Sequence, residues 1–133
     1  MKQVEVAVAI LLNGDNKVLT SWRQPHQHQG GLWEFPGGKR EADETMLDAL
    51  KREIHEELGV QVEHAEPFVR IDHDYGDKKV SLNVWLVSQF TGEPSGREGQ
   101  PLRWQAVDEM QADEFPAANS AIIDALKQAS LLA

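Results

Sequence analysis

The sequence predicts an α/β or α+β sandwich in which a mixed β-sheet packs between helices. Two segments, residues 43–58 and 116–131, have apolar residues at helical spacing. The segments before, between and after them are short and rich in β-branched and aliphatic residues, as strands are. Strands interleaved with two helices indicate a sheet covered by helices. The length of 133 residues is that of about one domain, so we expect a single domain over residues 1–133.

The first third of the chain predicts strands and turns. Residues 4–12 are almost all aliphatic or β-branched, which is typical of a strand buried on both faces. Asn13-Gly14-Asp15 is a turn sequence, so we expect a hairpin whose second strand covers residues 18–23. Residues 24–31 are polar and predict a loop. The short apolar segment 32–35 is ended by Pro36-Gly37-Gly38, which predicts a sharp turn before the first helix.

The first helix is expected between Asp43 and Leu58. Asp43 or Thr45 can cap its start, and Gly59 stands where a left-handed C-terminal cap is expected. Its apolar side chains form one stripe that faces the core: Leu47, Leu50, Ile54 and Leu58.

The rest of the chain predicts further strands and a second helix. The strands are expected at residues 60–62, 68–73, 80–90 and 102–106, with a hairpin turn at 75–77. The second helix is expected at residues 116–131, with Pro116 near its start. Its apolar stripe is Ile122, Ala125, Leu126 and Ala129.

Composition and charge exclude several kinds of function. With 13 Lys and Arg against 22 Asp and Glu, the net charge is −9, which argues against binding a nucleic acid polymer through its phosphates. An anionic ligand would need a cation as intermediary. The absence of cysteine excludes disulfides, a thiolate zinc site and a cysteine nucleophile. No apolar run approaches the ~18 residues of a membrane span, so we expect a soluble, cytoplasmic protein, and a monomer, because nothing indicates a protein partner.

Three carboxylates of the first helix share one face. Glu53, Glu56 and Glu57 stand at positions i, i+3 and i+4. An acidic face exposed to solvent is the alternative interpretation. The Gly37-Gly38 turn, however, can bring backbone carbonyls beside these side chains. Carboxylate and carbonyl oxygens are the ligands that Mg²⁺ and Mn²⁺ prefer, so the pattern indicates a divalent metal site.

The stretch from Gly38 to Val60, GKREADETMLDALKREIHEELGV, resembles the Nudix box. The spacing of its nine specified residues matches throughout: Gly38, Glu44, Arg52-Glu53-Ile54, Glu56-Glu57 and Gly59-Val60. Nearly the whole chain resembles one branch of that family, the MutT-type 8-oxo-dGTP diphosphatases, including WEFPGGK at 33–39, GEPSGREGQP at 92–101 and FPAAN at 115–119. The resemblance implies a Nudix α/β/α sandwich.

The resemblance also implies roles for individual residues. The divalent metal, Mg²⁺ with Mn²⁺ as a substitute, would be held by Glu53, Glu56, Glu57, Glu98 and the Gly37 carbonyl. Arg52 would orient the carboxylates, with Glu44 as its partner. Lys39 and Arg23 can contact the phosphates of a nucleoside triphosphate. The general base falls among Glu53, Glu56 and Glu98. Water would attack phosphorus and release a nucleoside monophosphate and pyrophosphate.

Asn119 is the candidate reader of the base. 8-Oxoguanine presents a donor at N7 beside the O6 acceptor, and an amide side chain matches this pair. Taken alone, Asn119 is better explained as a helix N-cap; the resemblance of FPAAN to the family reverses this preference and favours base recognition. Arg23, His28, Phe35 and Asp77 match nucleotide-contacting positions, although core packing or solvation also explains the last three. Lys78 stands where close relatives have Arg, and Lys cannot supply a planar fork of donors.

Three functions follow from these patterns. The first is a Mg²⁺-dependent 8-oxo-dGTP diphosphatase that removes the oxidised nucleotide from the pool. The second is a Nudix pyrophosphohydrolase of other nucleoside triphosphates, dihydroneopterin triphosphate or nucleotide sugars. The third is a non-catalytic nucleotide-binding module, which the four intact glutamates of the box argue against.

Overall fold

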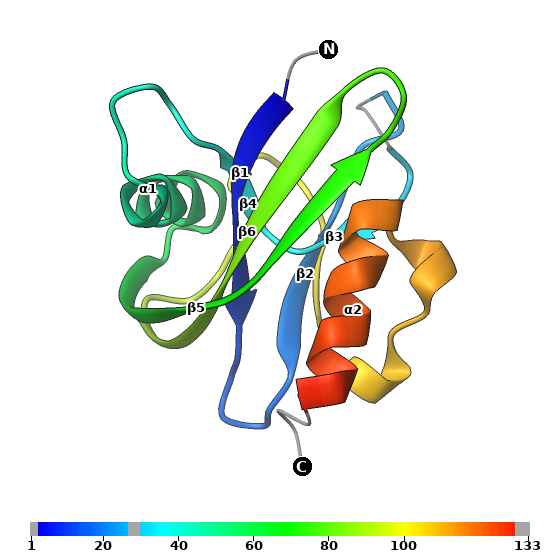
Figure 1. The fold of residues 1–133 in the computed structure, drawn as a ribbon. Helices are drawn as coiled ribbons and strands as arrows, with labels where there is room; N and C mark the ends of the chain where they lie inside the picture. The colour runs from blue at the N-terminus through cyan, green and yellow to red at the C-terminus, as the bar shows by residue number, and fades with distance from the viewer. Residues whose placement is uncertain (1–2, 27–29, 130–133) are drawn as a thin grey trace.

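The computed structural model describes residues 3–26 and 30–129 (Figure 1). These residues contain seven strands, two α-helices and two short 3-10 helices, in the order β1 (Gln3–Leu11), β2 (Val18–Trp22), β3 (Trp33–Glu34), β4 (Gly37–Lys39), α1 (Met46–Leu58), β5 (Gln61–Asp74), β6 (Lys79–Thr91), β7 (Leu102–Gln105), η1 (Val107–Glu109), η2 (Ala112–Glu114) and α2 (Ala117–Ala129). Within the described residues, no helix is long and apolar enough to cross a bilayer.

The strands form two sheets. The larger sheet has the order β4-β1-β6-β5, and the smaller has the order β3-β2-β7. β1 runs parallel to β6 and antiparallel to β4, so the larger sheet is mixed. The smaller sheet is antiparallel. The mixed α and β architecture confirms the predicted fold class.

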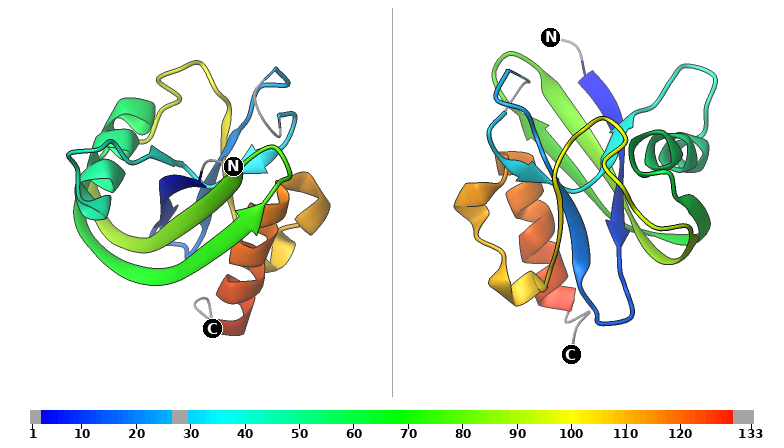
Figure 2. Two further views of the ribbon diagram at one scale, coloured as in Figure 1. Left: turned by 45° about the horizontal axis from the view of Figure 1, so that its top comes forward. Right: turned by 180° about the vertical axis from the view of Figure 1, so that it is seen from behind.

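β1 is buried on both of its faces, as its unbroken apolar run predicts. Ala7, Ala9 and Leu11 belong to one apolar cluster together with residues of α1. Val8 and Ile10 belong to a second cluster together with residues of α2. Successive side chains of a strand point to opposite faces, so the two helices cover opposite sides of the central strands (Figures 1 and 2).

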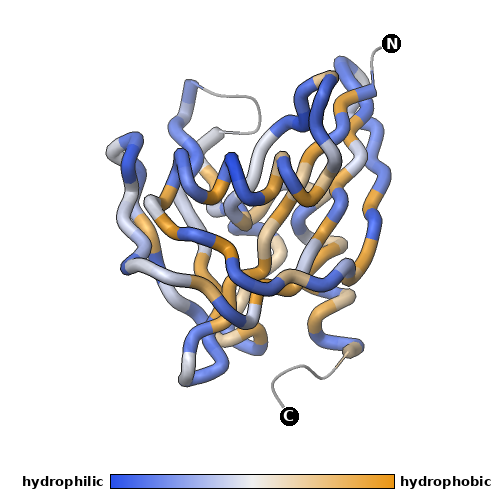
Figure 3. Tube along the Cα trace, turned by 90° about the vertical axis from the view of Figure 1, so that its left-hand side faces the viewer, coloured by the Kyte–Doolittle hydropathy of each residue, from blue (hydrophilic) through white to orange (hydrophobic). Residues whose placement is uncertain are grey.

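Helix α1 has the caps that the sequence predicts. The Thr45 hydroxyl accepts a hydrogen bond from Asp48 N at 3.1 Å, so Thr45 and not Asp43 is the N-cap. Gly59 ends the helix in the left-handed conformation with φ of 72°. Leu50, Ile54 and Leu58 are buried. Hydrophilic and hydrophobic positions alternate around this helix in Figure 3, as an amphipathic helix requires.

Helix α2 begins directly after Pro116, and its apolar stripe differs from the predicted one. Ile122 and Leu126 are buried as predicted, but Ile123 is buried too while Ala129 is exposed. Asn119 is the third residue of the helix. The N-cap explanation for Asn119 is therefore wrong, because an N-cap precedes the first helical residue.

The predicted hairpin between residues 4–12 and 18–23 is wrong in its pairing. In the described part of the chain, β2 pairs with β3 and β7, and a single isolated bridge from Leu12 to Val18 connects it with the end of β1. β1 instead pairs with β6 along its whole length and, through Val6–Val8, with β4 on its other edge. The turn itself forms, with Asn13 Oδ1 accepting hydrogen bonds from Asp15 N and Lys17 N.

Two other expectations also need correction. The strands predicted at residues 60–62 and 68–73 are one strand, β5, which begins at Gln61 and whose register against β6 shifts at three places including Pro67. β5 lies at the edge of its sheet, and edge strands and bulges are where a proline is tolerated. Gly37-Gly38 is also not a turn, because it forms the edge strand β4 against β1. A Cβ on Gly37 would collide with the Ala7 carbonyl, so glycine permits this close pairing.

Candidate functional site

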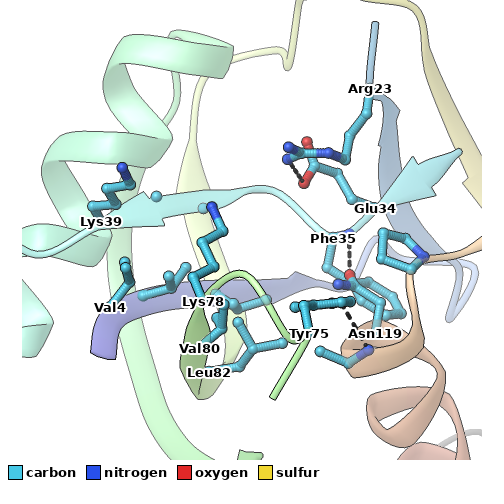
Figure 4. Close-up of a pocket in the computed structure, with 16 residues that line it drawn as sticks. Val4, Arg23, Glu34, Phe35, Lys39, Tyr75, Lys78, Val80, Leu82 and Asn119 are labelled. Carbon is cyan, nitrogen blue, oxygen red and sulfur yellow. Dashed lines mark hydrogen bonds and ion pairs between the residues drawn. The ribbon is translucent and has the colours of Figure 1, made fainter. Parts of the chain in front are cut away.

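A cavity of about 240 Å³ lies between the N-terminal end of α2, the strands β1 and β6 and the β3–β4 segment (Figure 4). Its floor is apolar, with Val6 and Val8 from β1 and Val80 and Leu82 from β6. Its polar side chains come from segments far apart in the sequence: Arg23, Glu34, Lys39, Tyr75, Lys78 and Asn119. An apolar hollow with a few convergent polar groups is typical of a small-molecule site.

Asn119 projects from the first turn of α2 into this cavity. Its Oδ1 accepts a hydrogen bond from Phe35 N at 3.1 Å. The neighbouring Ala118 N donates to the Tyr75 hydroxyl at 3.0 Å, which fastens the start of the helix to the β5–β6 turn. Phe35 is buried and stacks on Phe115 with ring centroids 5.5 Å apart. The position of Asn119 is therefore fixed from two sides.

Arg23 and Glu34 form an ion pair at the wall of the cavity. Arg23 Nη1 lies 2.8 Å from Glu34 Oε1, and about a quarter of each side chain is exposed. Burial raises the pKa of Glu34, and the Arg23 charge and hydrogen bond oppose that rise. The negative charge of Glu98 raises the same pKa further, so Glu34 connects the cavity electrostatically with the acidic residues beyond it.

Glu57 is the most strongly perturbed carboxylate of the site. Its Oε2 accepts a hydrogen bond from Gly37 N at 3.1 Å. Burial raises the pKa of Glu57 to about 9, and the charges of Glu34, Glu53 and Glu98 contribute in the same direction. Several partly buried carboxylates thus repel one another in one small region, an arrangement that favours binding of a cation.

Glu53 lies against the other glycine of β4. A Cβ on Gly38 would collide with its carboxylate, so the glycine allows the side chain to lie directly on the strand. Burial raises the pKa of Glu53, opposed by the hydrogen bond from Arg52 at 2.8 Å. The carboxylates therefore lie beside the β4 backbone, as the sequence predicts, although this backbone is a strand.

Arg52 connects the acidic residues of the first helix with the segment before it. Its Nε and Nη2 bind both oxygens of Glu44, at 2.6 and 2.9 Å, and its Nη2 also donates to the Lys39 carbonyl at 3.0 Å. Its Nη1 bonds to Glu53 and Glu56. The bidentate pair lowers the pKa of Glu44 to about 2. Arg52 thus holds carboxylates in place while Glu44 holds Arg52.

Glu98 and Glu56 lie at the solvent side of the cluster. Glu98 is exposed on the loop between β6 and β7, and its charge acts on Glu53 and Glu57. Glu56 is more than half exposed and lies 3.3 Å from Arg52 Nη1. Over residues 3–26 and 30–129, no three Asp, Glu or His side chains are grouped in a way that could hold a metal ion as they stand. The donors nevertheless fit a hard divalent cation, because they are carboxylates whose mutual repulsion a cation would relieve.

The structure brings most of the predicted residues together. Arg23, Phe35, Gly37, Lys39 and Asn119 line the cavity. Asp77 lies on the exposed β5–β6 turn and is not among the described residues that line the cavity, whereas its neighbour Lys78 is. His28 lies outside the described residues.

Sequence reasoning missed Glu34 and Tyr75 as cavity residues. Glu34 carries a signal that could have found it: it adjoins Phe35 in the WEFPGGK run and is acidic in an apolar segment. Tyr75 carries no comparable signal, since its place depends on the packing of the β5–β6 turn against α2.

Comparisons with known proteins show which proteins this chain is similar to. A model of the NUDIX domain matches residues 7–125. The 8-oxo-dGTP diphosphatase of Escherichia coli K12 is 38% identical over 128 residues, covering 96% of this chain and 99% of that protein. The CTP pyrophosphohydrolase of the same bacterium is 37% identical over 118 residues, covering 89% and 85%. A solved MutT structure, from work on Aliivibrio salmonicida and Vibrio cholerae, superposes with a TM-score of 0.81 at 34% identity, covering 96% and 99%.

Proposed function

The chain belongs to the Nudix hydrolase family, and from this premise we propose that it hydrolyses 8-oxo-dGTP to 8-oxo-dGMP and pyrophosphate with Mg²⁺. The observation that carries the proposal is that residues 35–37 connect two parts of one site. Phe35 N binds Asn119, the candidate base reader, and Gly37 N binds Glu57, the most perturbed carboxylate. Removing 8-oxo-dGTP before a polymerase can use it would protect replication from mutation.

The amide of Asn119 supports recognition of the oxidised base. Its carbonyl oxygen accepts one hydrogen bond from Phe35 N and has a second lone pair available. That lone pair can accept from N7–H of 8-oxoguanine while the amide NH₂ donates to O6. Guanine has no hydrogen on N7, so the same oxygen would face an acceptor. One such bidentate pair discriminates by about 1 to 3 kcal/mol.

Nudix hydrolases generally use a divalent metal, and we propose Mg²⁺ as the ion, with Mn²⁺ able to replace it. The proposed ligands are the carboxylates of Glu53, Glu56, Glu57 and Glu98 and the carbonyl of Gly37. When bound, the metal supplies neutralisation of phosphate oxygens and a lower pKa of water. A bound cation is needed because the protein has a net charge of −9 and a triphosphate brings further negative charge to it.

The remaining polar residues bind and orient. Lys39 is exposed at the edge of the cavity, where its ammonium can contact phosphate oxygens. Arg23 lines the cavity, where its guanidinium, which carries five N–H groups, can contact the nucleotide. Arg52 and Glu44 hold the helix carboxylates in position. The general base, which takes a proton from the attacking water, is one of Glu53, Glu56 and Glu98.

A second candidate substrate is CTP. The similarity to a CTP pyrophosphohydrolase, at 37% identity, favours it. The chemistry at phosphorus would be the same, and only the reading of the base would differ. A non-catalytic nucleotide-binding module has less support, because all four glutamates of the box are present and three of them surround Arg52.

A comparison of products and substrates tests the proposal. The protein is incubated with 8-oxo-dGTP, dGTP and CTP, with Mg²⁺ and with EDTA, and the products are separated by anion-exchange chromatography. We expect monophosphate and pyrophosphate from 8-oxo-dGTP in Mg²⁺ alone. Faster hydrolysis of CTP would favour the second candidate, and binding of nucleotide without any product would favour the non-catalytic module.

We also propose that residues 1–133 form one domain that acts as a monomer in the cytoplasm, where nucleoside triphosphates are made. Gel filtration with light scattering tests the monomer, for which the mass is 14.9 kDa.

A further inference from the structure

The loop between β6 and β7 lies on the C-terminal end of α1. The last carbonyls of a helix have no partner within the helix. Here Ser95 N donates to the Leu58 carbonyl and Arg97 N to the Glu57 carbonyl, each at 3.0 Å. The loop therefore caps the helix, and its backbone is held at the turn that carries Glu57.

Gln100 spans the two backbone segments that carry Glu57 and Glu98. Its side-chain Nε2 donates to the Glu57 carbonyl at 3.3 Å, and its Oε1 accepts from Glu98 N at 2.9 Å. An amide can do both because it has a donor and an acceptor on one planar group. The turn that presents Glu98 is closed by a hydrogen bond from Gly99 N to the Gly96 carbonyl at 2.9 Å.

Packing holds Gln100 in this position. It is half-buried, and Gly96 lies so close that a Cβ there would collide with the Gln100 carbonyl. The next residue, Pro101, accepts a hydrogen bond from Trp22 N at 3.0 Å at the start of β7. The Gln100 side chain is thus held between the C-terminal end of α1 and the start of β7.

We propose that Gln100 is a positioning residue that fixes the loop carboxylate of Glu98 relative to the helix carboxylate of Glu57. The inference rests on the proposed function, because it takes both carboxylates as ligands of the divalent metal. Glu98 is exposed, and its charge already acts on Glu57. Without the bridge, the Glu98 backbone would lose a hydrogen bond and the loop carboxylate its fixed distance from the helix. Metal affinity therefore depends on Gln100, although this side chain is not a ligand.

Binding of Mn²⁺ without nucleotide tests this inference. Free Mn²⁺ is measured by electron paramagnetic resonance during titration of wild type, Gln100→Leu and the matched control Gln105→Leu. Gln105 also donates its side-chain amide to a backbone carbonyl, that of Glu109, at 3.1 Å. We expect Gln100→Leu to weaken Mn²⁺ binding about 10-fold or more, as loss of a group that orients metal ligands does, and Gln105→Leu to leave binding unchanged.

The same substitution in a Glu98→Gln background shows through which residue Gln100 acts. We expect Gln100→Leu to change Mn²⁺ affinity less than about twofold there, because the carboxylate that it positions is already gone. Unchanged affinity in Gln100→Leu alone, or an equal loss in both backgrounds, would overturn the inference. If Gln100→Leu does not fold, Gln100→Asn is used, since its shorter side chain cannot reach both partners. A protein that fails to hydrolyse 8-oxo-dGTP but shows these Mn²⁺ effects would refute only the proposed function.

Discussion

The backbone N–H of Gly37 donates a hydrogen bond to Oε2 of Glu57 over 3.1 Å. Two residues earlier, Phe35 N–H donates to Oδ1 of Asn119, also over 3.1 Å. One short extended segment therefore touches the acidic helix α1 on one side and the start of α2 on the other. This segment joins the proposed site of phosphate chemistry to the proposed site of base recognition.

Replacing Glu53 or Glu57 by Gln should lower metal-dependent turnover of 8-oxo-dGTP by at least ~10², because each change removes an anionic oxygen from the metal site. The fold should survive, and circular dichroism checks it. Glu109→Gln is a matched control, since the Glu109 side chain accepts a hydrogen bond from Ala106 N that Gln can also accept. Activity retained in both site variants would refute the metal assignment.

The metal-free protein should lose stability as pH rises from about 5 to 9. Burial raises the pKa of Glu57 from 4.5 to about 9, so in this range the folded state holds a proton that the unfolded state has lost. The favourable contribution is complete below pH 4.5 and disappears as the pH passes 9. The slope is at most about 1.4 kcal/mol per pH unit. Urea unfolding in EDTA at a series of pH values measures this dependence of the free energy of unfolding on pH. Glu57→Gln should make the dependence less steep. If the slope in that variant equals that of the wild type, groups other than Glu57 cause the loss of stability.

The two glycines of β4 should respond differently to alanine. A Cβ on Gly37 meets the β1 backbone at Ala7 and Val8, which cannot move, so Gly37→Ala should destabilise the fold by about 1 to 3 kcal/mol. The three atoms nearest to a Cβ on Gly38 all belong to the Glu53 carboxylate, which can move. Gly38→Ala should therefore keep the melting temperature but lower kcat by up to ~10², as small displacements of catalytic groups do. Equal effects of the two substitutions on melting temperature would contradict this distinction.

Asn119→Ala should lower the preference for 8-oxo-dGTP over dGTP. The free-energy difference that corresponds to the ratio of the two kcat/KM values should fall by about 1 to 3 kcal/mol, which is the discrimination that one bidentate amide pair gives. The ratio of kcat/KM values for the two substrates measures it. Ser120→Ala is the control, since this neighbouring hydroxyl binds the Ala112 carbonyl instead of facing the cavity. An unchanged ratio in Asn119→Ala would leave Asn119 with only its structural bond to Phe35.

Local sequence patterns predict much of this fold because helix caps and apolar helix faces depend on interactions between residues that are close in the sequence. The caps at Thr45 and Gly59 and the apolar stripe of α1 depend on residues within a few turns of each other. The pairing of β2 is different. Its partners are β3 and β7, whereas β1 pairs with β4 and β6, and the turn residues at Asn13 do not encode this choice between strands that are distant in the sequence.

The residues of the candidate site are likewise of two kinds: some are predicted from the sequence, and others are identified only from the folded structure. The spacing of Glu53, Glu56 and Glu57 predicts a shared helix face, and family resemblance adds Glu98 and Asn119. The roles of Glu34 and Gln100 depend on contacts between distant segments. Glu34 matters because its charge reaches Glu57, and Gln100 because it bridges a loop and a helix. The place of Glu34 in the WEFPGGK run is a sequence signal for that residue, but the contacts themselves follow from the folded arrangement.

The most direct test of the central claim is the ratio of kcat/KM for 8-oxo-dGTP to that for dGTP, measured for the wild-type protein in Mg²⁺. A site that reads the oxidised base through Asn119 and leaves buried polar groups unpaired with dGTP should give a ratio approaching ~10⁴. A ratio near one, with either substrate hydrolysed, would keep the Nudix chemistry but contradict recognition of the oxidised base in this cavity.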